Sequence, residues 1–337
     1  MPIHLCERDP RVPADRLVAE LVPPPLFAQV SFESYRPDPS QPSQQQALDT
    51  VRGFADTVGQ RPRKRLFGRV RTAAGAGGVY LDGGYGVGKT HLLASLWHAA
   101  PGPKLFATFG ELTHLVGALG FHDAAEALSS YALVCVDEFE LDDPGDTVLV
   151  STLLTRLREG GVRLAATSNT LPGRLGEGRF ATDDFLREIQ GLSAHFESVR
   201  IDGEDYRHRG LPDAPPAPDV DTVKRIAEQD GASFDHFVDL SHHLAQVHPS
   251  KYGALLDGVR VVCLEDVRTV DDHAVALRLV VLVDRMYDRG LPVVASGRTF
   301  DELFTPALLE GGYRKKYFRA ISRLVALARE GATLTSG

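Results

Sequence analysis

The sequence predicts an α/β fold built on a parallel sheet, and this prediction depends on two motifs and on the order of the segments around them. Residues 83–90 read GGYGVGKT, which matches the pattern G-x-x-x-x-G-K-T between an apolar run and a helical pattern. Residues 131–136, YALVCV, form a continuous apolar run that ends at Asp137 and Glu138. Such a run is typical of a strand buried on both faces of a parallel sheet.

The first motif predicts a Walker A phosphate-binding loop. Residues 79–81 before it have strand character, and residues 91–100 after it are apolar at helical spacing, an order that a chance glycine-rich turn would lack. Glycines let successive N–H groups point at one phosphate, and the start of the helix adds partial positive charge. Lys89 is expected to reach the β- and γ-phosphates of ATP, and the Thr90 hydroxyl to ligate Mg²⁺. The residues expected to bind ATP are Gly83, Gly84, Tyr85, Gly86, Val87, Gly88, Lys89, Thr90 and His91.

The second motif places two acids where an open α/β sheet binds ligands, at the carboxyl end of a strand. Asp137 is expected to hold Mg²⁺ through its water shell. Glu138 is expected to polarise the water that attacks the γ-phosphate. The alternative is that the two acids cap the next helix, but capping would explain neither the apolar run nor the phosphate loop.

The segments that follow complete the order of an ATPase core with an additional strand. Residues 104–109, KLFATF, predict a second strand after the helix of the phosphate loop. Residues 162–166 predict another buried strand, and Asn169 just beyond it is expected to orient water as a sensor. Arg179 lies in the glycine-flanked stretch GEGRF, before a fifth strand at residues 199–201. This order predicts a P-loop NTPase of AAA+ type with a parallel five-stranded core sheet. The expected catalytic residues are Lys89, Glu138, Asn169 and Arg179, with Arg187 and Arg207 as alternatives for the arginine.

Three regions are expected along the chain. Residues 1–42 are a proline-rich N-terminal arm, whose Phe27, Phe32, Tyr35 and Arg36 can pack onto a domain and offer the flat apolar surface that adenine needs. Residues 43–210 are the ATPase core, which begins with a helix capped by Ser43. Residues 211–337 are a C-terminal α/β region, which either extends the sheet or forms a lid.

The C-terminal region contains an echo of the second motif. Residues 262–266 read VCLED, similar to VCVDE at residues 134–138. No glycine-rich lysine loop precedes the second copy, so the pattern favours a generic βαβ unit over a second ATP site. On the last predicted helix, residues 314–329, Arg319 and Arg323 are expected either to sense nucleotide or to be surface charges.

Composition limits the other function classes. A formal charge of −8 argues against a general nucleic-acid coat, although the basic cluster at residues 61–71 indicates a subunit contact or a nucleic-acid contact. The three cysteines show no metal spacing, and the histidines at 242, 243 and 248 lack carboxylates at ligand spacing. No apolar run approaches the roughly 18 residues of a membrane span, and no signal-type leader is present, so we expect a cytoplasmic protein.

Taken together, several segments resemble the ZapE family of AAA+ ATPases. They are PPPLF, SFESYRPDPSQPSQ, GGYGVGKT, DEFELDDPGD, AATSN, IDGEDYRHR, ALRLVVLVDRMYD and YFRAISRL, in this order from Leu21 to Leu324. The resemblance implies a cytoplasmic homo-oligomeric ATPase of bacterial division that acts on or near the FtsZ ring. Val87 stands where many members have a basic residue, and residues 176–179 stand where many have Gly-Leu-Gln-Arg. The alternative is a nucleotide-gated adaptor, similar to helicase loaders, that touches nucleic acid.

Overall fold

The computed structural model describes residues 2–59, 77–84, 86–139, 144–170, 194–203 and 213–335. It divides into two compact units. Residues 14–208 form one, called the ATPase unit after the ATPase core predicted within it, and residues 1–13 together with 209–337 form the other, called the C-terminal unit. The arm expected over residues 1–42 is therefore divided between the units. Its first part joins the C-terminal unit because Ile3 forms a parallel bridge with Ser233.

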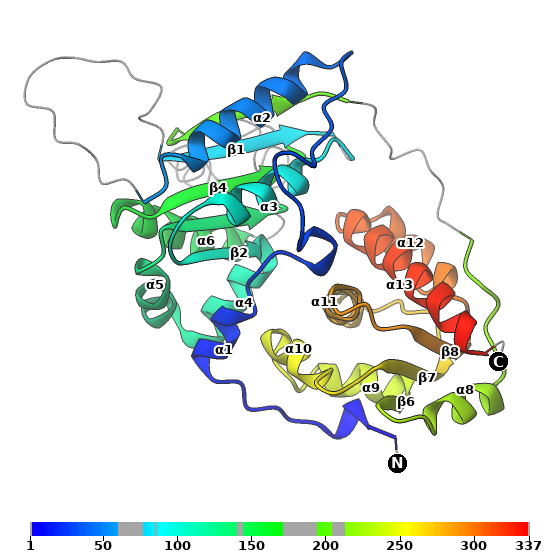
Figure 1. Ribbon diagram of the computed structural model, residues 1–337. Coiled ribbons are helices and arrows are strands. Elements are labelled where there is room, and N and C mark those ends of the chain that lie inside the picture. The colour runs from blue at the N-terminus through cyan, green and yellow to red at the C-terminus, as the bar shows by residue number, and fades with distance from the viewer. Residues whose placement is uncertain are drawn as a thin grey trace, which may run out of the picture. The chain divides into compact units, whose positions relative to one another are not determined.

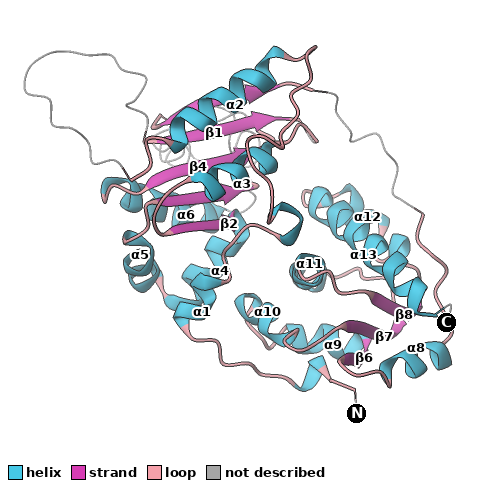
Figure 2. Cartoon of the chain, viewed as in Figure 1, coloured by secondary structure: helices cyan, strands magenta, loops and turns pink. Residues whose placement is uncertain are grey.

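The ATPase unit contains one parallel sheet of five strands in the order β2-β3-β4-β1-β5 (Figures 1 and 2). The strands are β1 (Gly78–Gly83), β2 (Lys104–Thr108), β3 (Leu133–Asp137), β4 (Arg163–Ser168) and β5 (Phe196–Ile201). β4 lies between β1, which leads into the phosphate loop, and β3, which ends at the acids. An additional strand thus separates the two motifs, and the predicted AAA+ fold class is confirmed.

Six described helices belong to the ATPase unit. They are α1 (Ala14–Ala19), α2 (Pro42–Ala55), α3 (Lys89–Ala99), α4 (Phe109–Leu119), α5 (Phe121–Ser129) and α6 (Pro144–Glu159). The continuous apolar runs of β1 and β3 are buried along their whole length. The cap expected at Ser43 is wrong: α2 begins at Pro42 and its N-cap is Gln41. Ser43 Oγ accepts the N–H of Asp202 instead, at 2.9 Å, and ties α2 to the end of β5.

The C-terminal unit has a parallel sheet of its own, in the order β6-β7-β8. Its strands are β6 (Ala232–His236), β7 (Val261–Val267) and β8 (Val293–Gly297), and its helices are α8 (Val220–Ala227), α9 (Phe237–Leu244), α10 (Tyr252–Leu255), α11 (His273–Asp288), α12 (Pro306–Glu310) and α13 (Arg314–Thr335). These strands pair with one another, so they do not extend the five-stranded sheet. In the described part of the chain, no helix is long and apolar enough to cross a membrane.

The sheet of the C-terminal unit repeats three strands of the ATPase sheet in the same register. Lys104 faces Leu133 across β2 and β3, and Ala232 faces Val261 across β6 and β7. β3 pairs with β4 as β7 pairs with β8. The helix after β2 begins FGELTH, and the helix after β6 begins FVDLSH. Strand order, register and sequence therefore agree over this stretch.

The hydrogen bonds at the strand ends repeat as well. The N–H of Glu138 donates to Thr167 Oγ1 at 3.1 Å, and the N–H of Asp266 donates to Ser296 Oγ at 3.1 Å. Glu138 and Asp266 have φ values of 52° and 58°, and they are the only non-glycine residues with positive φ in the described ranges. The echo in the sequence thus marks a shared and unusual backbone conformation.

Candidate nucleotide site

The phosphate loop joins β1 to α3, and its glycines meet specific steric demands. Gly86 and Gly88 have φ values of 80° and 87°, a left-handed region that glycine adopts at little cost. A Cβ on Gly83 would lie 2.2 Å from the carbonyl oxygen of Ile201 at the end of β5. Gly88 is the N-cap of α3 and makes no side-chain cap hydrogen bond, so no capping side chain covers this helix N-terminus, the kind of site where anions bind.

Lys89 is buried at the base of the loop, with 9% of its surface exposed. Its Nζ donates to the carbonyl oxygens of Gly83 and Gly84, at 2.9 and 2.5 Å, and to Asn169 Oδ1 at 3.0 Å. The structure therefore brings the predicted phosphate-binding lysine and the predicted sensor into direct contact. They come from α3 and from the end of β4.

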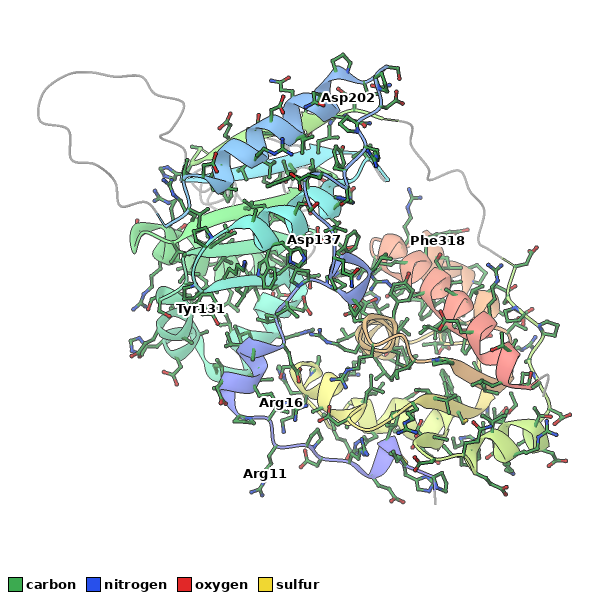
Figure 3. The ribbon with its side chains drawn as sticks, in the orientation of Figure 1. Arg11, Arg16, Tyr131, Asp137, Asp202 and Phe318 are labelled. Carbon is green, nitrogen blue, oxygen red and sulfur yellow. The ribbon has the colours of Figure 1, made fainter. Side chains whose placement is uncertain are left out.

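Asp137, the last residue of β3, is labelled in Figure 3. It is 6% exposed and accepts hydrogen bonds from two hydroxyl groups. Thr90 Oγ1 lies 3.2 Å from Asp137 Oδ1, and the Thr167 hydroxyl donates to the same oxygen. Burial and the neighbouring Glu138 carboxylate raise the pKa of Asp137 to about 6, although both hydroxyl groups oppose this rise. At neutral pH the carboxylate is ionised, and a divalent cation beside it would offset the cost of burying its charge.

Glu138 follows Asp137 in a left-handed backbone conformation that is strained for a residue with a Cβ. The neighbouring strand holds this turn in place. Thr167 accepts the N–H of Glu138 through its hydroxyl and the N–H of Phe139, at 2.7 Å, through its carbonyl oxygen. Sequence analysis assigned no role to Thr167. Its polar side chain at the tip of an apolar strand, two residues before Asn169, was the signal available.

The segment before α2 contacts the phosphate loop through Tyr35, and it contacts the first turn of α3 at His91. The Tyr35 hydroxyl donates to the carbonyl oxygen of Val87 at 2.9 Å. The His91 ring, on the first turn of α3, lies edge-on to the Tyr35 ring with centroids 5.5 Å apart. His91 Nε2 is within 2.9 Å of Ser34 Oγ and 3.2 Å of the Ser31 carbonyl oxygen. The His91 side chain thus contacts the arm, and only its main chain belongs to the helix N-terminus expected to bind phosphate.

Some predicted site residues lie outside the described residues. These are Tyr85, Arg179, the alternatives Arg187 and Arg207, and the basic cluster at residues 61–71. Arg319 and Arg323, considered as nucleotide sensors, are described. Both bind the carboxylate of Asp284 in the C-terminal unit, Arg319 at 2.9 Å, so their guanidinium groups stabilise the contact between α13 and α11.

The described residues fit ATP and Mg²⁺. The loop offers main-chain N–H groups, a helix N-terminus and the ammonium group of Lys89, which are the partners that phosphates prefer. Thr90 and Asp137 offer a hydroxyl and a carboxylate oxygen 3.2 Å apart, which are hard donors of the kind that Mg²⁺ selects. Both sets lie at the carboxyl ends of β1 and β3.

Comparison with known proteins places the chain in a family of ATPases. A family model described as AFG1-like ATPase matches residues 11–229 and residues 217–334. The chain belongs to the AFG1-like ATPase family. This AFG1-like chain is 31% identical over 152 residues to the cell division protein ZapE of Escherichia coli K12, a match that covers 41% of the chain and 40% of ZapE. It is 28% identical over 149 residues to an uncharacterized protein of Schizosaccharomyces pombe, covering 39% and 33% of the two chains. The chain thus matches about 40% of the length of ZapE.

Solved structures similar to the AFG1-like chain include AMPPCP-bound DnaA from Aquifex aeolicus and the DnaC helicase loader. The DnaA structure is 14% identical, with a TM-score of 0.39 over 52% of this chain and 50% of DnaA. The DnaC structure is 18% identical, with a TM-score of 0.38 over 52% of this chain and 99% of DnaC.

Proposed function

We propose that the protein hydrolyses ATP with the help of Mg²⁺ at the carboxyl end of the five-stranded sheet. The convergence of Lys89, Asn169, Thr90 and Asp137 from three separate elements is the observation that supports the proposal most directly. A glycine-rich turn with no ligand would not need a buried lysine beside a sensor amide. Nor would it need a buried carboxylate beside a hydroxyl.

Each residue has a role in this proposal. Lys89 exchanges its contacts with Gly83 and Gly84 for phosphate oxygens, and Asn169 orients the attacking water. Thr90 and Asp137 hold Mg²⁺, which neutralises phosphate charge when it is bound. Glu138 accepts a proton from the attacking water. The hydrogen bond to Thr167 holds the main chain of Glu138 at the end of β3.

The wider role is drawn from the similarity to the cell division protein ZapE. We propose a cytoplasmic homo-oligomer that remodels or regulates a protein partner in division, with the FtsZ ring as the partner implied by the sequence resemblance. In this assembly Arg179 of one subunit completes the site of its neighbour. The measured quantity that separates this role from a loader of nucleic acid is the stimulation of turnover. FtsZ should raise the rate of phosphate release, whereas stimulation by single-stranded DNA with a steep salt dependence would favour the loader.

Two substitutions test the ATPase proposal itself. Lys89→Ala should abolish the binding of a fluorescent ATP analogue, because it removes the buried cation beside the loop. Glu138→Gln should retain binding while turnover falls by roughly 10² or more, since the amide cannot accept the proton from water. Binding unchanged in Lys89→Ala would show that this loop is not the site. Full turnover in Glu138→Gln would show that another residue activates the water.

A further inference from the structure

Tyr35 is a residue of the arm whose hydroxyl group contacts the phosphate loop. It is 8% exposed, its hydroxyl donates to the carbonyl oxygen of Val87, and its ring lies against Gly88. A Cβ added to Gly88 would come within 2.5 Å of Tyr35 Cε2. Burial raises the pKa of Tyr35, so the hydroxyl keeps the proton that it donates.

This contact determines the direction of one main-chain N–H group. The carbonyl oxygen of Val87 and the N–H of Gly88 belong to the same trans peptide unit, in which they point in opposite directions. Since Tyr35 holds the Val87 oxygen on one side, the Gly88 N–H must point to the other side. The left-handed φ of Gly88 allows the backbone to turn there.

The arm that carries Tyr35 is itself held to α3. His91, on the first turn of α3, contacts Ser34 Oγ and the Ser31 carbonyl oxygen on the same short segment. The segment is therefore held on both sides of Lys89, at Val87 in the loop and at His91 in α3. A contact with this geometry restricts the loop before any ligand arrives.

We propose that Tyr35 is a positioning residue, which fixes the Val87–Gly88 peptide so that the Gly88 N–H is ready to bind a nucleotide phosphate. The proposal rests on the proposed ATPase function, because it assigns an N–H group of that same site. Preorganised donors bind more tightly since their ordering cost is met before binding. Tyr35 then affects affinity for nucleotide and has little effect on the chemical step.

The test compares Tyr35→Phe with a matched variant in the full-length protein. Tyr252→Phe is the control, because Tyr252 is also buried and its hydroxyl also donates to a main-chain carbonyl, that of Leu244 in the C-terminal unit. Tyr35→Phe should weaken binding of a fluorescent ATP analogue about tenfold, the cost of one unsatisfied buried carbonyl. It should raise KM by a similar factor with kcat nearly unchanged, whereas Tyr252→Phe should alter neither.

Lys89→Ala is measured in parallel to separate the two ideas. If Lys89→Ala abolishes binding and Tyr35→Phe binds like the wild type, the positioning role is wrong and the ATPase site stands. If Lys89→Ala binds normally, the site itself is wrong. An equal loss of affinity in Tyr35→Phe and Tyr252→Phe would assign the effect to general destabilisation and overturn the positioning role.

A second inference rests on the repeated sheet. The register of β6 with β7 matches that of β2 with β3. Counted back from β6 by the spacing that separates the phosphate loop from β2, the sequence reads LPDAPPAP at residues 211–218. Proline has no main-chain N–H, so a segment with four prolines is a poor phosphate cradle. The acids of the second copy are paired with cations of the chain: Glu265 with Lys224 at 3.0 Å, and Asp266 with Arg268 at 2.7 Å.

We infer that residues 217–297 are a second copy of half of the ATPase core that does not bind nucleotide. Equilibrium dialysis should give one ATP analogue per wild-type chain and none for Lys89→Ala. Two per chain, or one that persists in Lys89→Ala, would overturn the inference.

The shared backbone is tested separately. Asp266→Gly should unfold at a higher temperature than Asp266→Ala, because only glycine adopts the left-handed φ freely, and equal midpoints would contradict a retained strained turn.

Discussion

Thr167 offers the sharpest test of how the site is held together, since one hydroxyl group serves two neighbours. It is 1% exposed, it donates to Asp137, and it accepts the N–H of Glu138 at 3.1 Å. Thr167→Val keeps the shape of the side chain and removes the hydroxyl. Both contacts are lost, while the apolar packing of β4 stays the same.

The expected cost follows from the two contacts. A hydrogen bond to an ionised carboxylate contributes about 1.5–3 kcal/mol, and a buried N–H that loses its acceptor costs about 1–3 kcal/mol. Because both contacts use the same oxygen, their costs do not add in full. We expect Thr167→Val to lower the free energy of unfolding by about 3 kcal/mol. For a unit of this size, about 2–4 °C is lost per kcal/mol, so the melting temperature should fall by roughly 6–12 °C. Turnover should fall at least ~10-fold, since Glu138 is no longer held at the end of β3.

Ser296→Ala is the matched control for Thr167→Val. The Ser296 hydroxyl accepts the N–H of Asp266 at the same distance, 3.1 Å, in the C-terminal unit. Its removal should cost only about 1 kcal/mol and leave ATP turnover unchanged. Differential scanning calorimetry and a phosphate-release assay measure both effects. If Thr167→Val turns over ATP like the wild type and loses no more stability than Ser296→Ala, Thr167 does not organise the acid pair.

Two further predictions concern the assembly and the C-terminal unit. Glu138→Gln and Arg179→Ala should each be nearly inactive, yet their mixture should recover part of the phosphate release, because some interfaces then pair an intact Glu138 with an intact arginine. Recovery with Arg187→Ala, and none with Arg179→Ala, would move the assignment to Arg187. Burial raises the pKa of Asp284, but Arg319 and Arg323 outweigh it and hold that pKa below its ordinary value. The stabilisation that the ionised Asp284 gives to the folded state is therefore complete above about pH 4, and it is lost as the pH falls through the lowered pKa of Asp284. Urea unfolding of Asp284→Asn should show a flatter dependence on pH in that range, and an unaltered slope would contradict the role of this ion pair.

The sequence by itself determined the fold class and the residues to propose for the site, because local chemistry constrains their spacing. A phosphate loop needs glycines and a lysine between a strand and a helix, and a buried strand needs a continuous apolar run before its acids. These patterns are contiguous, so Lys89, Thr90 and Asp137 could be named before any tertiary contact was known. Lys89 also contacts Asn169, because β4 lies between β1 and β3 in the sheet.

Only the tertiary structure decided which distant segments meet. Tyr35 is 52 residues from Val87, and nothing in the periodicity of either segment indicates that a tyrosine hydroxyl would orient a peptide of the loop. The sequence did not indicate a partner for Arg319 and Arg323 of α13, and the structure shows that both bind Asp284 of α11. The repeated half-core was visible as a five-residue echo, but its register and shared left-handed turn are properties of strand pairing. Such contacts join segments that are far apart in the sequence, whereas hydrophobic periodicity reports only local secondary structure.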